Sequence, residues 1–250
     1  MTFPVSRRAL LIGALPVAAL GLSACGSSQN SSSSSPSASP AASSASSSVS
    51  SAASSSAATE AGSSASASAS DGYVGYRLNS EVPGAGTATL YTDYQCPYCA
   101  KAEPKFEEAA KKLDGVLNVT VRHMPLDIHA NAVPAALAVQ AAEAQGKHVE
   151  MANKVFSTQE DWKNTKDIAA LRTLFGNYAK ELGLDTDKFD KDLVDKKTLE
   201  IVKKDYDHAL SIGVKGTPSF VVNDKVVQGL DSASSVDELI ETFKREAGVK

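Results

Sequence analysis

Two cysteines separated by two residues lie at a junction between a predicted strand and a predicted helix. Cys96 and Cys99 follow the apolar run Thr87–Tyr94, and the helix-forming run Ala100–Leu113 comes directly after them. A Cys-x-x-Cys pair at such a junction is typical of redox sites, because a helix N-terminus stabilises a thiolate. The pair therefore predicts thiol–disulfide chemistry at the start of a helix.

A long segment of low complexity limits how much of the chain can fold. Ser27–Ser70 is almost entirely serine and alanine, and it holds no apolar residue larger than valine. Such a segment cannot offset the entropy lost on ordering. We expect a disordered tether over residues 25–72 and one folded domain over residues 73–250. The formal net charge of −4 and the lack of a basic run give no indication of nucleic-acid binding.

The first 24 residues have the features of an export signal. Arg7 and Arg8 precede the apolar run Ala9–Leu22, which is too short for a confident membrane-spanning helix. The motif Leu-Ser-Ala-Cys that ends at Cys25 resembles the bacterial lipobox, whose cysteine carries the lipid. This resemblance implies a lipoprotein signal peptide over residues 1–24 and a lipid anchor on Cys25. The alternative is a plain secretory signal with an unrelated cysteine.

The apolar pattern of the remaining chain predicts short strands at both ends of a helical block. Tyr73–Leu78 and Leu117–Val121 read as strands, and Ser219–Val222 with Val226–Gln228 read as a hairpin. A last helix is expected over Ser235–Ala247, opened by a capping box that ends at its fourth residue, Glu238. The predicted helices of the block are Pro134–Gln145, Lys147–Phe156, Thr165–Leu182 and Thr186–Leu210, with stops at Gly146, Gly183 and Gly213.

Four motifs in this order resemble the DsbA family, whose architecture is the thioredoxin fold with a helical insertion. The first two are Asp93–Cys99 and Pro104, a proline eight residues after Cys96 where the active-site helix is expected to kink. The others are the run that begins at Arg122–Leu126 and the loop Gly213–Phe220. The resemblance implies an α/β, thioredoxin-like fold over residues 73–250, with an all-helical insertion at about 129–212 between the central strands.

The residue types around the cysteines predict distinct roles for the two thiols. Cys96 at the helix N-terminus should have a depressed pKa and act as the attacking thiol. Cys99, one turn later and more buried, is the expected resolving thiol. Pro97 suits the first helical position, where no N–H is needed. Asp93 is expected either to hydrogen-bond the active-site turn or to modulate thiol protonation.

The family resemblance adds expectations for three further residues. It implies that Thr217 and Pro218, joined by a cis peptide bond, pack against the disulfide and that the Thr217 backbone pairs with an extended substrate. Tyr98 occupies the position of a histidine in the best-known DsbA, so it bears on the strength of the oxidant. No cofactor is expected apart from the redox-active Cys96–Cys99 disulfide, and no metal.

These expectations favour an extracytoplasmic thiol:disulfide oxidoreductase that oxidises cysteine pairs in exported proteins. The family implies a membrane enzyme of the DsbB or vitamin K epoxide reductase type as its reoxidising partner, and the lipid anchor implies contact with the outer face of the cell membrane. A reductase of the same fold is the nearest alternative. An isomerase, a glutaredoxin-type enzyme and a tethered, non-redox binding or chaperone-like module are further alternatives.

Other functions for the same residues are weaker. A zinc site would need two more ligands beside Cys96 and Cys99, and the four histidines show no paired spacing next to the motif. An inert structural disulfide across so short a loop would add little stability. His123 and His129 are expected in a loop and at a helix entry rather than in catalysis. Three aromatic residues at helical apolar spacing are expected in the core: Phe156, Trp162 and Phe175.

Overall fold

The computed structural model describes residues 75–249. The predicted signal peptide, the tether and Cys25 lie outside these residues, so the expectations for them stay predictions. The strands are β1 (Tyr76–Arg77), β2 (Thr87–Thr92), β3 (Asn118–His123), β4 (Ser219–Val222) and β5 (Lys225–Val226). The helices are α1 (Pro97–Lys112), α2 (Ala132–Glu143), α3 (His148–Ser157), α4 (Gln159–Trp162), α5 (Ile168–Glu181), α6 (Thr186–Asp192), α7 (Lys196–Ser211) and α8 (Val236–Glu246).

The strands form one mixed sheet with β2 at its centre. The strand order is β1-β3-β2-β4-β5, with β2 and β3 parallel and the other neighbours antiparallel. Leu90 of β2 pairs with Val121 on one side and Phe220 on the other. A parallel pair needs a crossover connection, and α1 supplies it between β2 and β3. The cysteine pair therefore lies directly after the central strand.

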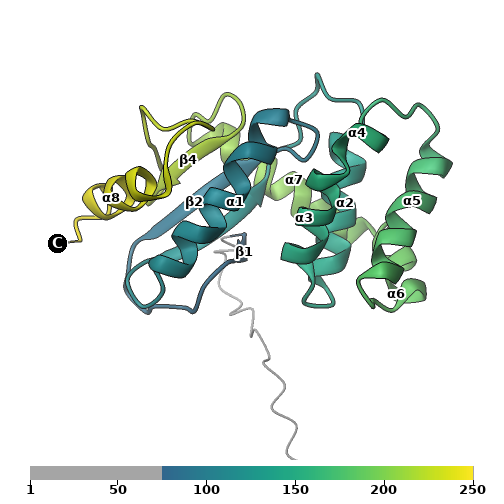
Figure 1. Cartoon of the computed structure of the whole chain (residues 1–250), viewed down its shortest axis with the longest axis horizontal. Coiled ribbons are helices and arrows are strands. Elements are labelled where there is room, and N and C mark those ends of the chain that lie inside the picture. Colours follow the sequence, from purple (N-terminus) through teal and green to yellow (C-terminus); the bar gives the residue numbers. More distant parts are fainter. Residues whose placement is uncertain (1–74, 250) are drawn as a thin grey trace, which may run out of the picture. The chain divides into compact units, whose positions relative to one another are not determined.

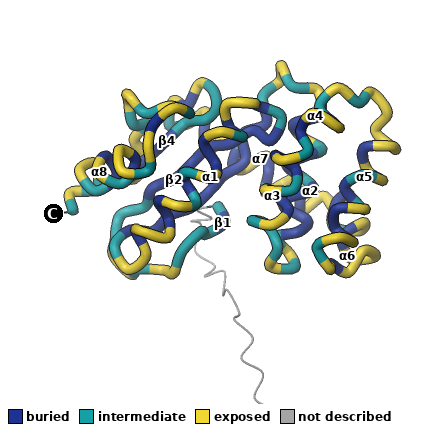
Figure 2. Tube along the Cα trace, in the orientation of Figure 1, coloured by how far each residue is buried: buried dark blue, intermediate teal, exposed yellow. Residues whose placement is uncertain are grey.

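Helices α1 and α8 pack together on the sheet (Figure 1). Phe106 of α1 lies 5.8 Å from Phe243 of α8 and 6.0 Å from Phe220 of β4, measured between ring centroids. All three rings are buried. The central strand β2 is almost entirely buried as well and is drawn mostly in dark blue in Figure 2. The predicted capping box of α8 is confirmed, with Ser235 and Glu238 bonded reciprocally.

The chain between β3 and β4 is all helical within the described residues, as the family resemblance implies. It comprises α2 to α7, drawn in green beside the sheet in Figure 1. A buried ion pair joins this insertion to the sheet: Arg122 Nε of β3 lies 2.7 Å from Asp205 Oδ1 of α7. The other oxygen of Asp205 accepts the backbone N–H of His123 at 3.0 Å. Phe156, Trp162 and Phe175 are buried in the insertion, which confirms their expected place in the core.

Several predicted boundaries are wrong, and polar side chains explain most of the differences. The single helix expected over Thr186–Leu210 is two helices, because Asp195 caps a new helix by accepting the Lys197 N–H at 2.9 Å. The short helix α4 was not predicted. Strand β2 ends at Thr92 rather than Tyr94, since the Asp93 carboxylate accepts the Gln95 N–H at 2.8 Å and closes a turn.

The ends of β3 and β5 also differ from the prediction. Strand β3 runs on to His123, which pairs with Thr92 of β2. Strand β5 is Lys225–Val226 rather than Val226–Gln228, because the turn is made by Asn223 and Asp224, whose φ angles are 48° and 61°. Among the described residues, no helix combines the length and apolar character needed to cross a membrane.

Candidate active site at the start of helix α1

Cys96 is the N-cap residue of α1. Its backbone is extended, with φ −77° and ψ 122°, and Pro97 occupies the first helical turn as expected. The Cys96 side chain makes no capping hydrogen bond to the helix in the thiol form. The sulfur therefore lies beside backbone N–H groups that have no partner within the helix, which is an environment that favours an anion.

The surroundings of Cys96 favour its thiolate. Several hydrogen bonds together lower the pKa of Cys96 from 9.0 to about 6, against the opposing effect of burial. The largest contribution comes from the Cys99 thiol, and smaller ones come from the backbone N–H groups of Cys99 and Tyr98 and from the Thr217 side chain. At pH 7 the attacking sulfur is thus mostly ionised, which agrees with the role expected for it.

Cys99 has the opposite character. It is fully buried, and burial followed by its hydrogen bond to Cys96 raises the pKa of Cys99 well above the usual value. The backbone N–H of Asp93 donates to Cys99 Sγ at 3.4 Å. Cys96 is also buried but keeps 4% of its surface exposed, whereas Cys99 has none. A thiolate that reaches the surface and a fully buried, protonated thiol suit a nucleophile and its resolving thiol.

The second wall of the site comes from the loop that follows the helical insertion in the sequence. The Thr217 carbonyl lies 3.6 Å from Cys96 Sγ and accepts a hydrogen bond from it when Cys96 is a thiol. The peptide bond from Thr217 to Pro218 is cis, as the family resemblance implies. The Thr217 hydroxyl is buried without a hydrogen-bond partner, so it is free to donate to the sulfur once Cys96 is ionised.

Asp93 holds the active-site turn and the entry to the insertion together. Its carboxylate accepts the backbone N–H of Gln95 at 2.8 Å and that of Leu126 at 2.9 Å. The ring of His129 lies 2.7 Å from the same carboxylate, measured from Nδ1 to Oδ2. Asp93 therefore has the first of its two expected roles, hydrogen bonding of the turn, and it brings His129 next to the site as well.

Tyr98, the second residue between the two cysteines, has an exposed side chain. Its side chain is 58% exposed, and Lys101 Nζ lies 5.8 Å from the ring centroid. An exposed aromatic ring beside a reactive cysteine is available to a protein substrate rather than to the Cys96 thiolate. The structure thus places the side chain of Tyr98 on the rim of the site and its backbone N–H at the sulfur.

A buried carboxyl in α1 was missed by the sequence analysis. Glu103 is 1% exposed, and its pKa is raised from 4.5 to about 8. Burial is the main cause, and the nearby Glu107 carboxylate is the second. Its Oε1 accepts the hydroxyl of Tyr76 at 3.5 Å, and that hydroxyl lies 3.2 Å from the hydroxyl of Tyr94. The spacing of four residues from Cys99 is the available signal, because it puts Glu103 on the same buried helix face.

The other histidines lie away from the cysteine pair. His123, expected in a loop, is the buried last residue of β3, and its ring bonds Gln140 Oε1 at 3.0 Å. It ends a strand because it continues the pairing of β3 with β2. His208 bonds the Tyr91 hydroxyl at 2.6 Å. Within residues 75–249, no group of three or more His, Cys, Asp or Glu side chains is arranged to hold a metal ion.

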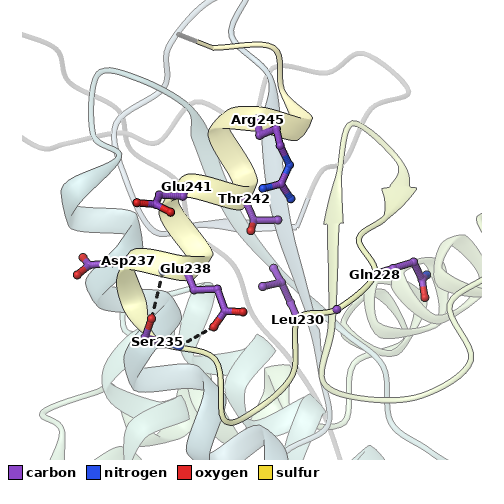
Figure 3. Close-up of a pocket in the computed structure, with 9 residues that line it drawn as sticks. Gln228, Leu230, Ser235, Asp237, Glu238, Glu241, Thr242 and Arg245 are labelled. Atoms are coloured by element: carbon purple, nitrogen blue, oxygen red, sulfur yellow. Dashed lines mark hydrogen bonds between the residues drawn. The ribbon is translucent and has the colours of Figure 1, made fainter.

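A pocket between α8 and the segment after β5 is distinct from this site. Asp237, Glu238 and Glu241 line it on one side and Gln228 on the other (Figure 3). Glu238 is already engaged in the capping box with Ser235, shown by the dashed lines in Figure 3. None of the predicted site residues within 75–249 lines this pocket, so the cysteine site is the stronger candidate for function.

Sequence comparison places most of the folded part in one family. A family model described as thioredoxin matches residues 85–242, which is more than half of the chain. Among curated proteins, an Na(+)/H(+) antiporter NhaA 3 from Salinispora tropica is 36% identical over 138 residues. That match covers 55% of this chain but only 20% of the antiporter, so the chain spans about a fifth of the length of this relative.

Solved structures with the same architecture are thiol–disulfide proteins. A thioredoxin-like oxidoreductase from Silicibacter pomeroyi DSS-3 matches with a TM-score of 0.52 and 25% identity, over 66% of this chain and 88% of that one. DsbA from Xylella fastidiosa matches with a TM-score of 0.55 and 19% identity, over 70% of this chain and 92% of that one. These matches confirm the expected fold class.

The matched region contains both walls of the site, from Cys96 to Pro218, together with β2, α1 and β4. The mixed sheet and its surrounding helices agree with these solved structures in fold. The chain therefore belongs to the thioredoxin family, with DsbA-type thiol–disulfide oxidoreductases as its structural neighbours.

Proposed function

We propose that the chain is an extracytoplasmic thiol:disulfide oxidoreductase that transfers the Cys96–Cys99 disulfide to cysteine pairs in exported proteins. The observation that carries this proposal is the difference between the two thiols. The pKa of Cys96 is lowered to about 6, whereas that of the buried Cys99 is raised. A stabilised Cys96 thiolate favours the reduced form, so the oxidised form is a good donor of disulfides.

The exchange runs in two steps that balance in electrons and protons. A substrate thiolate attacks Cys96 Sγ, the Cys96–Cys99 bond breaks, and Cys99 leaves and takes up a proton. The second substrate thiol then loses its proton and attacks the substrate sulfur of the mixed disulfide, and Cys96 leaves as a thiolate. The substrate loses two electrons and the protein gains them. Cys96 is the better final leaving group because its pKa is the lower of the two.

The geometry supports an extended substrate at the second wall. The backbone of Thr217 borders Cys96 at 3.6 Å, and residues 216–219 are only partly buried. Backbone pairing is tolerant of sequence, which suits an enzyme that meets many exported proteins. The exposed ring of Tyr98, two residues after Cys96, adds apolar contact area for a protein substrate.

An equilibrium redox titration tests the direction of electron flow. Purified protein is equilibrated with reduced and oxidised glutathione, and its thermal unfolding midpoint is measured in both redox states. We expect the reduced form to be the more stable, by a margin that grows as pH rises from 6 toward 9, because the lowered pKa of Cys96 adds stability above its folded value. A potential near that of thioredoxin, about −270 mV, would instead indicate a reductase.

A tethered binding or chaperone-like module is the competing hypothesis from another class. In such a module the cysteines would be structural, and Cys96 would ionise like an ordinary thiol, near pH 8.5. The lowered pKa of Cys96 argues against that module, and so does the Thr217 carbonyl at its sulfur. The glutathione titration separates the two, since a structural pair would exchange with glutathione only slowly.

We also propose that Cys25 carries a lipid, so that the domain works at the outer face of the cell membrane. Supporting this are the lipobox-like residues before Cys25 and the serine- and alanine-rich segment that separates it from the domain. A membrane enzyme of the DsbB or vitamin K epoxide reductase type would then restore the disulfide. In cells, Cys25→Ser should move the protein from the membrane fraction to the soluble fraction, and continued membrane association would contradict the anchor.

A further inference from the structure

Amide side chains join the active-site turn to the helical insertion. Gln95, the residue before Cys96, uses both ends of its amide: Nε2 donates to the Lys163 carbonyl at 2.7 Å, and Oε1 accepts the Asn131 backbone N–H at 2.7 Å. Gln159 Nε2 donates to the Tyr94 carbonyl at 2.9 Å. We call Gln95, Asn131 and Gln159 the amide clasp.

The insertion's side of the clasp is itself rigidly held. Asn131 is 2% exposed, and its side-chain Nδ2 donates to the carbonyls of Trp162, Lys163 and Thr165 at 3.0, 3.3 and 2.9 Å. Trp162 is fully buried and packs edge-on against Phe175, with 5.7 Å between ring centroids. The Lys163 carbonyl, which accepts the hydrogen bond from Gln95, is therefore held in place by the core of the insertion.

The turn on the other side of the clasp is also held by the Asp93 carboxylate, which accepts the backbone N–H groups of Gln95 and Leu126. Cys96 donates its backbone N–H to the Asp93 carbonyl at 3.0 Å, and its side chain makes no capping bond to α1. The two residues before Cys96, Tyr94 and Gln95, are both hydrogen-bonded to the insertion. Cys96 Sγ lies between the N-terminus of α1 and the Thr217 carbonyl. Its position therefore depends on the hydrogen bonds that join the turn before it to the helical insertion.

We propose that Gln95 is a positioning residue that sets the location of the Cys96 sulfur by fastening the active-site turn to the helical insertion. This inference rests on the proposed function, because a positioning role matters only if Cys96 reacts with substrates. The contacts themselves, from Gln95 to Lys163 and Asn131, involve neither cysteine. All three members of the clasp are neutral amides, so they act on the sulfur through position rather than through charge. A misplacement of a reacting group by about 1 Å can cost about a hundredfold in rate, which makes such a contact measurable.

The chain offers a matched control for Gln95. Gln145 makes the same two-ended bridge elsewhere, with Nε2 donating to the Asp185 carbonyl at 3.1 Å and Oε1 accepting the Asp185 backbone N–H at 3.0 Å. Both ends of that bridge lie within the insertion, and neither Gln145 nor Asp185 contacts the cysteine site. Replacing either glutamine with alanine deletes one bond to a carbonyl and one bond from a backbone N–H. Of the two glutamines, Gln95 is the one next to Cys96.

The test compares Gln95→Ala with Gln145→Ala in the full chain carrying Cys25→Ser. The readouts are the rate constant for the reaction of Cys96 with oxidised glutathione from pH 4 to 9 and the thermal unfolding midpoint. At the alkaline plateau, where Cys96 is ionised in every variant, we expect Gln95→Ala to react about tenfold more slowly with oxidised glutathione. Gln145→Ala should stay within about twofold of the parent chain, because its bridge lies outside the site.

Equal plateau rates in the two variants would overturn the positioning role, even if both unfold at a lower temperature. Gln95→Glu provides a second variant should Gln95→Ala fail to fold. It keeps the oxygen that accepts the Asn131 N–H but loses the donor to Lys163, so its rate should fall between those of the parent and Gln95→Ala. The pH dependence of the Cys96 rate in the parent chain tests the proposed function separately. If Cys96 ionised there with the pKa of an ordinary thiol, the proposed function would be rejected. The ratio of the plateau rates of Gln95→Ala and Gln145→Ala would still decide the role of Gln95.

Discussion

A Cys99→Ser variant will accumulate mixed disulfides with its protein substrates, and a Cys96→Ser variant will form none. The thiol of Cys96 has the lowered pKa. Its sulfur lies at the start of α1, 3.6 Å from the Thr217 carbonyl. Cys99 is fully buried, so no substrate sulfur reaches it directly. With Cys99 replaced, Cys96 still forms a mixed disulfide by attacking a substrate disulfide, but no neighbouring thiol remains to release the substrate. With Cys96 replaced, the sulfur that exchanges with substrates is absent.

The measurement is non-reducing electrophoresis of protein recovered from cells after acid quenching, followed by release with a reductant. Disulfide transfer to a reduced model substrate should fall to the uncatalysed rate in both variants. The wild-type protein, which resolves its mixed disulfides, is the reference for both. Capture by Cys96→Ser to the same extent as by Cys99→Ser would reverse the assignment of attacking and resolving thiols.

Glu103→Gln is expected to stabilise the oxidised protein at pH 8 and to remove part of its pH dependence. The carboxyl of Glu103 is buried, and its pKa is raised from 4.5 to about 8 in the folded state. Between these values the folded state keeps the proton and the unfolded state does not, so stability falls as pH rises, by about 1.4 kcal/mol per unit for one proton. Glutamine fills the same volume without this loss, and we expect a gain on the order of 4 kcal/mol at pH 8.

The measurement is urea unfolding of oxidised wild type and variant at intervals from pH 5 to pH 8. The oxidised form is used because Cys96 then does not titrate in the same range. Glu108→Gln is the matched control, since Glu108 lies on the same helix but is 56% exposed and pairs with Lys112 at 3.1 Å. A Glu103→Gln variant that is less stable than wild type at pH 8 would show that the carboxylate, rather than the neutral acid, is the favoured form.

Much of the thioredoxin-like core could be predicted from the sequence because its signals are local. The apolar run before Cys96, Pro97 at the first helical position and the capping box at Ser235 each act within a few residues. The boundaries that were wrong depend on contacts with distant strands or on single polar side chains. His123 belongs to β3 only because Thr92 is its partner in β2, and α7 begins where Asp195 caps it.

The candidate site divides in the same way. Cys96, Cys99 and Asp93 stand in one short motif, and Thr217 and Pro218 were reached only through a family resemblance. Gln95, Asn131 and Gln159 carry no pattern that marks them, because a hydrogen bond between an amide and a distant carbonyl leaves no periodic trace in the sequence. For Glu103 the spacing of four residues from Cys99 indicates the buried helix face, but its partner, the Tyr76 hydroxyl, lies 27 positions away and leaves no signal in the sequence.

The Thr217 carbonyl lies 3.6 Å from Cys96 Sγ in space, although the two residues are 121 positions apart in the chain. A contact of such long sequence separation forms only after the entropy of closing the intervening loop has been overcome. A growing chain that has reached only the end of α7 carries both cysteines but has no Thr217 to face them. The full reactivity of Cys96 is therefore a property of the finished chain, acquired after the cysteines themselves have been synthesised.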